Sequence, residues 1–147
     1  MGYITNTDIQ TRLGNSTYVQ LADDNGDGTA DAAIVDEARL AAEGEVNGYL
    51  ARRYPVPIDV VEHSELATVL KSVTLDLAEY RLRTRRPPVP GDVIRRRQET
   101  AEWLKGVAEG RIALPSASQI GSNTAMGIVA SSHGAERLLS REELESH

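Results

Sequence analysis

Residues 22–57 read ADDNGDGTADAAIVDEARLAAEGEVNGYLARRYPVP, an acidic loop followed by a long segment of helical periodicity. The apolar residues of the segment recur every three or four positions, as on one face of a helix. They are Ile34, Ala38, Ala41, Ala42, Val46, Tyr49 and Leu50. Arg52 and Arg53 follow where cations favour a helix C-terminus. Pro55 and Pro57 cannot continue a helix. The stretch therefore predicts a loop and one long helix that ends before residue 55.

The rest of residues 1–115 carries further helix signals. Thr5 can cap a short helix through Leu13, because its hydroxyl accepts from the free amides of a first turn, and a second short helix is expected at residues 16–21. A long helix is predicted from Ser64, with one apolar face: Leu66, Val69, Leu70, Val73, Leu77 and Tyr80. A third long helix is predicted to begin at residues 90–92, with these residues on its inward face: Ile94, Ala101, Leu104, Val107 and Ala108. Three long amphipathic helices with short connections predict an all-α fold, a small antiparallel helical bundle over residues 1–115.

Residues 116–147 are predicted to form an extended C-terminal tail that attaches to a partner. Residues 116–134 are dominated by Ser, Gly, Ala and Asn, which bury too little apolar surface to fold alone. We expect this tail to become ordered only on a partner, with main-chain pairing around residues 126–130. Its apolar residues are the candidate contacts: Met126, Ile128, Val129, Leu138, Leu139 and Leu144.

The composition argues against several function classes. The 147 residues include no cysteine, so a disulfide framework, a thiolate metal site and a thiol nucleophile are excluded. The formal net charge of -6 argues against a general nucleic-acid-binding protein, which needs a basic surface. No apolar run approaches the roughly 18 residues of a membrane span, so we expect no membrane partner. GxSxG, P-loop and HExxH patterns are also missing, and we expect no enzyme activity and no catalytic residues.

The acidic loop has the ligand spacing of an EF-hand-like calcium site. Oxygen-bearing side chains occupy the first, third, fifth and ninth positions, as Ca²⁺ prefers; they are Asp23, Asn25, Asp27 and Asp31. The twelfth position, which should hold a bidentate Glu, is Ile34. The alternative is a turn whose Asp and Asn side chains bond the local backbone. The loop thus leaves a small calcium-binding module as an alternative function, and otherwise no cofactor is expected.

Two groups of arginines flank the short connection after the Ser64 helix: Arg81, Arg83, Arg85 and Arg86 before it, and Arg95, Arg96 and Arg97 after it. They are predicted to meet at one end of the bundle. Three interpretations are open: solvated helix ends, docking against carboxylates of a neighbouring subunit, or contact with passing DNA. Trp103 falls off the inward face of its helix, and either covers the edge of the bundle or anchors an interface.

Several strings, in this order, resemble the small head–tail connector (adaptor) proteins of Mu-like phages and prophages. They are YIT at 3–5, DDNGDG at 23–28, GYLARRYP at 48–55, LDLAEYRL at 75–82 and AEWLKGVAEG at 101–110. The resemblance covers roughly residues 3–115. The order and spacing of these strings together carry the resemblance.

The resemblance implies a structural protein of the virion, made in the host cytoplasm and placed at the head–tail junction. Such subunits form a homo-oligomeric ring, usually a dodecamer, beneath the portal protein. The ring continues the DNA channel toward a stopper or tail-completion protein, and genomic DNA passes through it without sequence-specific binding. A negatively charged lumen suits such a conduit, because DNA would slide past it rather than bind.

Overall fold

The computed structural model describes residues 2–115 and 117, and it confirms the predicted all-α fold for them. The described residues hold five helices: α1 (Asn6–Leu13), α2 (Asn15–Ala22), α3 (Ala32–Leu50), α4 (Ser64–Arg83) and α5 (Gly91–Ala108). No strand occurs within this part of the chain. The two short and three long helices match the elements that the sequence predicts.

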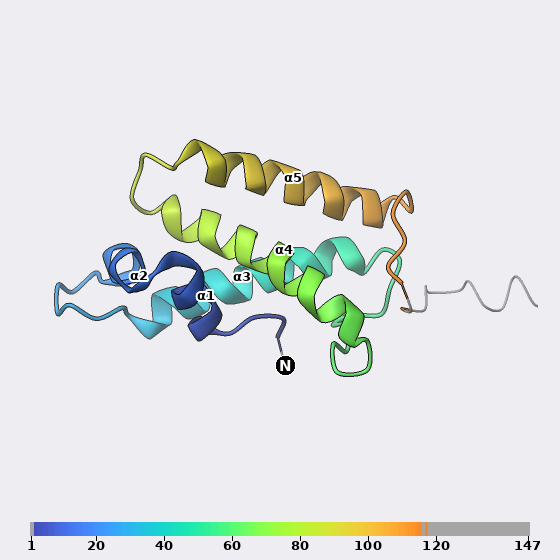
Figure 1. The fold of residues 1–147 in the computed structure, drawn as a ribbon, viewed down its shortest axis with the longest axis horizontal. Helices are drawn as coiled ribbons and strands as arrows, with labels where there is room; N and C mark the ends of the chain where they lie inside the picture. Colours follow the sequence, from blue (N-terminus) through green and yellow to red (C-terminus); the bar gives the residue numbers. More distant parts are fainter. Residues whose placement is uncertain (1, 116, 118–147) are drawn as a thin grey trace, which may run out of the picture. The chain divides into compact units, whose positions relative to one another are not determined.

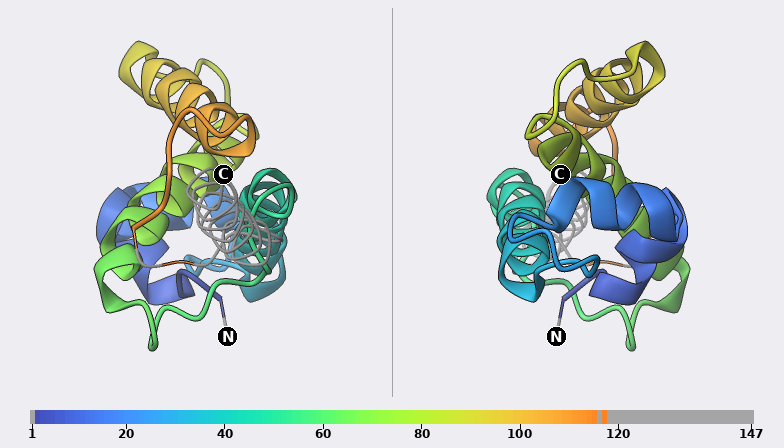
Figure 2. Two further views of the ribbon diagram at one scale, coloured as in Figure 1. Left: turned by 90° about the vertical axis from the view of Figure 1, so that its right-hand side faces the viewer. Right: turned by 90° about the vertical axis from the view of Figure 1, so that its left-hand side faces the viewer.

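Helix α4 lies at the centre of the bundle (Figure 1). It packs against α3 and α5, and it runs antiparallel to both of them. The short helices α1 and α2 pack together and cover α3 and α4, whereas α5 lies across α4 and α3 (Figure 2). Each of the other four helices described therefore contacts α4.

Local signals start and separate the short helices. Thr5 Oγ1 accepts a hydrogen bond from the Asp8 backbone N–H, and the Asp8 carboxylate accepts one from the Thr5 N–H, which completes a capping box. Gly14 then adopts a φ of 80° between α1 and α2. Residues other than glycine rarely adopt this backbone conformation, so Gly14 permits the sharp change of direction between the two helices.

Leucine is the commonest residue of the core, which also holds Val, Ala, Ile and Tyr, and the chain has no phenylalanine. Its largest leucines are at most 1% exposed: Leu50, Leu66, Leu70, Leu77, Leu82 and Leu104. Burying each such side chain contributes about 1.5–3 kcal/mol relative to leaving it in water. Most of these leucines come from α4, in agreement with its central position.

The structure corrects two details of the predicted helices. Val93, not Ile94, faces the core at the start of α5, because Val93 is 2% exposed and Ile94 is 38% exposed. Arg52 and Arg53 lie beyond the end of α3 at Leu50 and do not form its last turn. Arg53 instead donates to the carbonyl oxygens of Ala108 and Glu109 at the end of α5.

Two tyrosines fasten the ends of the bundle domain to its interior. The Tyr3 hydroxyl accepts a hydrogen bond from the Ile58 N–H and donates one to Asn47. Tyr54, which is 1% exposed, accepts one from the Leu114 N–H. The chain is thus held in the bundle as far as residue 114. The predicted tail contacts at Met126, Ile128, Val129, Leu138, Leu139 and Leu144 lie outside the described residues.

Candidate functional surfaces

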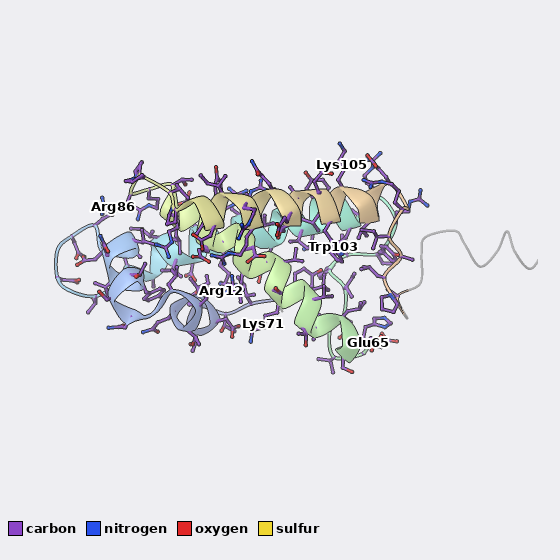
Figure 3. The ribbon with its side chains drawn as sticks, turned by 45° about the horizontal axis from the view of Figure 1, so that its top comes forward. Arg12, Glu65, Lys71, Arg86, Trp103 and Lys105 are labelled. Carbon is purple, nitrogen blue, oxygen red and sulfur yellow. The ribbon has the colours of Figure 1, made fainter. Side chains whose placement is uncertain are left out.

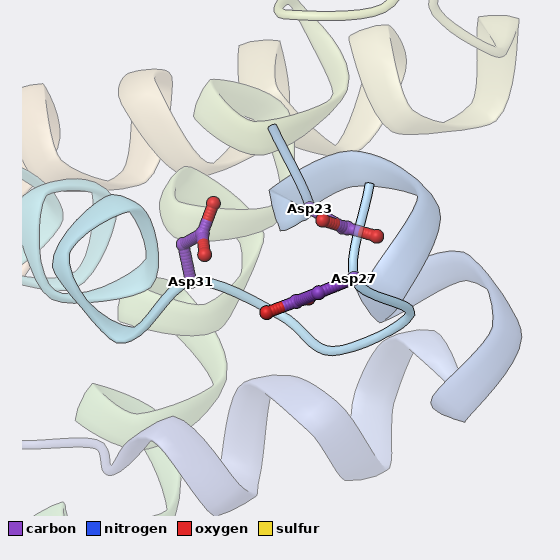
Figure 4. A group of neighbouring side chains, drawn as sticks. All are labelled: Asp23, Asp27 and Asp31. Carbon is purple, nitrogen blue, oxygen red and sulfur yellow. The ribbon is translucent and has the colours of Figure 1, made fainter. Parts of the chain in front are cut away.

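The side chains of the acidic loop between α2 and α3, of which Figure 4 draws Asp23, Asp27 and Asp31, form hydrogen bonds within the loop. The Asp23 carboxylate accepts from the backbone N–H groups of Gly26 (2.8 Å) and Gly28 (2.9 Å). Asp27 accepts from the backbone N–H and the hydroxyl of Thr29. These hydrogen bonds hold the pKa of the Asp27 carboxyl below its ordinary value. The loop therefore forms the turn, stabilised by side-chain bonds to the local backbone, that the sequence analysis gives as the alternative to a calcium site.

The same loop brings three of the four predicted calcium ligands together. Asp23, Asp27 and Asp31 each offer a carboxylate oxygen, and these oxygens lie within 4.8 Å of one another. The fourth, Asn25, donates its side-chain amide to Asp31 at 3.0 Å. Oxygen ligands at this spacing suit a hard cation. However, the loop is exposed, and hydrogen bonds within the protein already stabilise its turn.

The loop is tied to the end of α4 through Asp24. The Asp24 carboxylate accepts hydrogen bonds from both Arg85 and Arg86. The same two guanidinium groups donate to the carbonyl oxygens of Leu21 and Gln20 in the last turn of α2. Cations are favourable at a helix C-terminus. Arg85 and Arg86 therefore connect α2, the acidic loop and α4 at one end of the bundle (Figure 3, where Arg86 is labelled).

The other predicted arginines divide between internal pairs and solvent. The Glu45 carboxylate on α3 forms salt bridges with Arg81 from α4 (2.9 Å) and with Arg97 from α5 (2.7 Å). Arg83 and Arg96 bond Glu79. Arg95 differs, because its side chain is 71% exposed and its contact with Glu99 is 3.8 Å long. The seven arginines therefore do not gather as one solvated cluster at an end of the bundle. Whether any of them contacts a partner stays a prediction.

Asp76, which is partly buried, and Glu79, which is buried, form a carboxylate cluster that the sequence patterns do not predict. Both residues lie on α4, and Glu79 is 3% exposed. Arg12 from α1 and Arg96 from α5 reach both carboxylates, and Thr100 donates to Asp76 at 3.0 Å. Two acidic residues three positions apart, interleaved with buried Leu75, Leu77 and Ala78, are the signal that could have revealed it. The cluster connects α1, α4 and α5.

Trp103 lies on α5 and packs, partly buried, against the core (Figure 3). This position agrees with the interpretation that Trp103 covers an edge of the bundle. A role of the same side chain in an interface stays a prediction. No helix in the described part of the chain combines the length and the apolar character that crossing a membrane requires.

These features define a small all-α protein whose helices are tied together by charged side chains. The sequence model of the family described as Bacteriophage Mu, Gp36 matches residues 3–130. The chain belongs to this family. Membership makes it a Mu-like phage protein and indicates a structural or assembly role in the phage. A search of the curated proteins finds none that matches the chain. The phage relationship predicted from the sequence is therefore confirmed, whereas the position within the particle stays a prediction.

Proposed function

We propose that the protein is a head–tail connector (adaptor) subunit that forms a ring beneath the portal protein. The ring continues the DNA channel toward the stopper or tail-completion protein. The observation that carries the proposal is the family match over residues 3–130, which spans the whole bundle. In this proposal the protein acts by holding its partners, without a catalytic step and without a bound cofactor.

The charged contacts of the bundle suit a subunit that must transmit force without deforming. Glu45 bonds α4 and α5 to α3, and the cluster of Asp76 and Glu79 bonds α1 and α5 to α4. Such cross-helix pairs lose their geometry if one helix slides relative to another. Removal of one partner of a buried pair is strongly destabilising. The bundle is therefore suited to keep its shape while the particle assembles.

In this proposal residues 116–147 supply the attachment. Main-chain pairing around residues 126–130 and apolar contacts from Leu138, Leu139 and Leu144 would join the ring to a neighbouring protein. A segment that orders only on its partner loses conformational entropy at that moment. Assembly would then proceed in sequence, because the portal must be present before the attachment forms.

The mass of the purified protein, measured with and without the portal protein of the same phage, tests the proposal. We expect a complex of defined stoichiometry only in the mixture, seen by native mass spectrometry and by analytical ultracentrifugation. Portal protein from an unrelated phage is the control, and it should not bind. Separate masses in the matched mixture, at concentrations where the particle assembles, would contradict the proposal.

A further inference from the structure

A groove runs between α2 and the connection that joins α4 to α5. Its volume is about 580 Å³. Three arginines, Arg83, Arg85 and Arg86, and three prolines, Pro87, Pro88 and Pro90, form much of its lining. The groove therefore combines guanidinium groups with a rigid apolar surface, at the end of the bundle that carries the acidic loop.

The three arginines that line this groove pair, among the described residues, with two carboxylates, Asp24 and Glu79. Arg85 and Arg86 share the single carboxylate of Asp24. Arg83 shares Glu79 with Arg12 and Arg96. A guanidinium has five N–H donors, and the hydrogen bonds of Arg86 within the described residues use two of its three nitrogens. Its side chain is 47% exposed. The groove can therefore accept further carboxylates without losing its internal bonds.

The prolines favour a peptide as the occupant rather than DNA. Proline presents no backbone N–H, so Pro87 and Pro88 offer an apolar surface to an aliphatic side chain. The acidic loop lies beside the groove through Asp24, and the chain carries a net charge of -6. A long polyanion would be repelled by these charges, whereas a short acidic segment can reach the arginines alone.

We propose that the groove binds an acidic peptide segment, and that the segment is residues 142–145 of a second copy of this chain. These residues read EELE, three carboxylates around Leu144. The carboxylates would accept hydrogen bonds from the nitrogens that the internal bonds leave free, Nε of Arg85 and Nη1 of Arg86, and Leu144 would meet the prolines. The proposal rests on the proposed function, because a ring supplies the second copy, and it assigns Leu144 to a neighbouring subunit of the ring while residues 126–130, Leu138 and Leu139 remain for the portal. Residues 142–145 lie outside the described residues, so their charges come from the sequence alone.

Binding of a fluorescein-labelled synthetic peptide of residues 138–147 tests the proposal. The receptor is the full chain with Glu142→Gln, Glu143→Gln and Glu145→Gln, so that its own segment carries no competing charge. We expect Arg86→Glu in this receptor to weaken binding at least about tenfold, because like charges oppose at an interface. The matched control, Arg95→Glu, changes the same charge outside the groove and should weaken binding less than about twofold. Fluorescence anisotropy at low salt measures both.

A second variant keeps the test decisive if Arg86→Glu lowers the melting temperature. Thr17→Trp fills the groove from α2 without removing a cation, and it should also weaken peptide binding. A peptide whose three glutamates are replaced by glutamine should bind weakly to every receptor. Equal weakening by Arg86→Glu and Arg95→Glu, or binding unaffected by Thr17→Trp, would overturn the proposal. Tighter, Arg86-dependent binding of a short labelled DNA duplex would overturn it in favour of nucleic acid.

The outcomes separate this proposal from the connector function. If the portal mixture yields no complex but the peptide binds as expected, the result supports peptide binding in the groove and contradicts the connector function. If the ring assembles with the portal and Arg86→Glu leaves both assembly and peptide binding unchanged, the groove proposal alone fails.

Discussion

Asp27 stabilises the acidic loop by accepting two hydrogen bonds from Thr29. We expect Asp27→Ala to lower the melting temperature only modestly, because the Asp23 bonds to Gly26 and Gly28 remain. Added calcium should shift the melting temperature no more than magnesium does, since these hydrogen bonds already stabilise the turn. Thermal unfolding followed by circular dichroism measures both effects.

Asp59 offers a matched control for the calcium measurement. It also accepts two backbone N–H bonds in an exposed turn, from Val61 and Glu62, but it belongs to no group of three clustered acids among the residues that the structure describes. Asp59→Ala should cost a similar, small amount of stability and leave any calcium response unchanged. A large calcium-dependent rise in melting temperature that is lost in Asp23→Ala would support the calcium-binding interpretation instead.

Asp8 and Lys71 should contribute to the acid sensitivity of the fold. The hydrogen bond from Lys71 is the main reason why the pKa of Asp8 lies below its ordinary value of 3.8. A carboxyl with a lowered folded pKa stabilises the protein above the unfolded pKa, and this contribution is lost as the pH falls through the folded pKa. Lys71→Gln should therefore reduce the loss of stability between about pH 6 and about pH 3.

The expected difference is a fraction of a kcal/mol, because surface ion pairs typically contribute less than about 1 kcal/mol. Urea unfolding at both pH values measures it. Lys105→Gln is the control, since Lys105 is exposed and makes no ion pair with the described residues. If the free energy of unfolding falls equally from about pH 6 to about pH 3 in wild type and in Lys71→Gln, other carboxyl groups cause the loss of stability in acid.

At the level of the helices, Glu79 links three of them through Arg12, Arg83 and Arg96. Glu79→Gln removes a buried charge and leaves Arg83 without its carboxylate partner, whereas Arg12 and Arg96 keep Asp76. We expect a loss of roughly 2–3 kcal/mol in the free energy of unfolding, below the full cost of breaking a buried pair because the arginines are partly solvated. Glu99→Gln, in the exposed pair with Arg95, should cost less than about 0.5 kcal/mol. Equal effects in chemical denaturation would contradict this role of Glu79.

The three arginines at 95–97 should respond very differently to charge reversal. Arg95→Glu should leave stability within about 0.5 kcal/mol of wild type, because its side chain faces solvent. Arg96→Glu would place a negative charge against Asp76 and Glu79 and should destabilise the bundle by several times that amount. Circular dichroism melts distinguish the two. A joint reversal of residues 95–97 therefore cannot isolate an assembly defect, whereas Arg95→Glu can. Equal melting temperatures of the two single variants would contradict the internal role of Arg96.

The sequence predicts α5 less well than α4 for a physical reason. Val93, Thr100, Leu104 and Val107 form the buried face of α5, but Thr100 is polar and so interrupts the apolar pattern. It is buried because its hydroxyl donates to Asp76 on α4. The periodicity of apolar residues identifies a helix face that is buried by apolar contacts. It does not identify a buried position whose side chain is polar and hydrogen-bonded. For this reason the apolar pattern predicts Ile94, and not Val93, on the inward face of α5.

For the whole molecule, the sequence predicts the helices and their order, because prolines, glycines and caps lie at their ends. It also places Asp23, Asp27 and Asp31 in one loop, since nine consecutive residues contain them. It cannot pair Arg97 with Glu45 or Arg12 with Asp76, which lie 52 and 64 positions apart. Such pairs depend on how the helices cross. The sequence predicts that the two groups of arginines meet at one end of the bundle, but it cannot show which carboxylates they pair with there.

Deletion of residues 118–147 tests the division of the chain into a folding part and an attaching part. The bond from the Leu114 N–H to Tyr54 is retained, and so is Ala117, which packs against the core. We therefore expect the truncated protein to keep its helical circular dichroism signal and nearly its full melting temperature. In a phage that carries the deletion, we expect filled heads that leak DNA or fail to acquire tails, counted by electron microscopy. Deletion of residues 112–147 is the matched comparison, because it removes the Tyr54 bond and should lower the melting temperature. If the shorter deletion already unfolds the protein, residues 118–147 belong to the core of the bundle, and attachment must be sought on its helices.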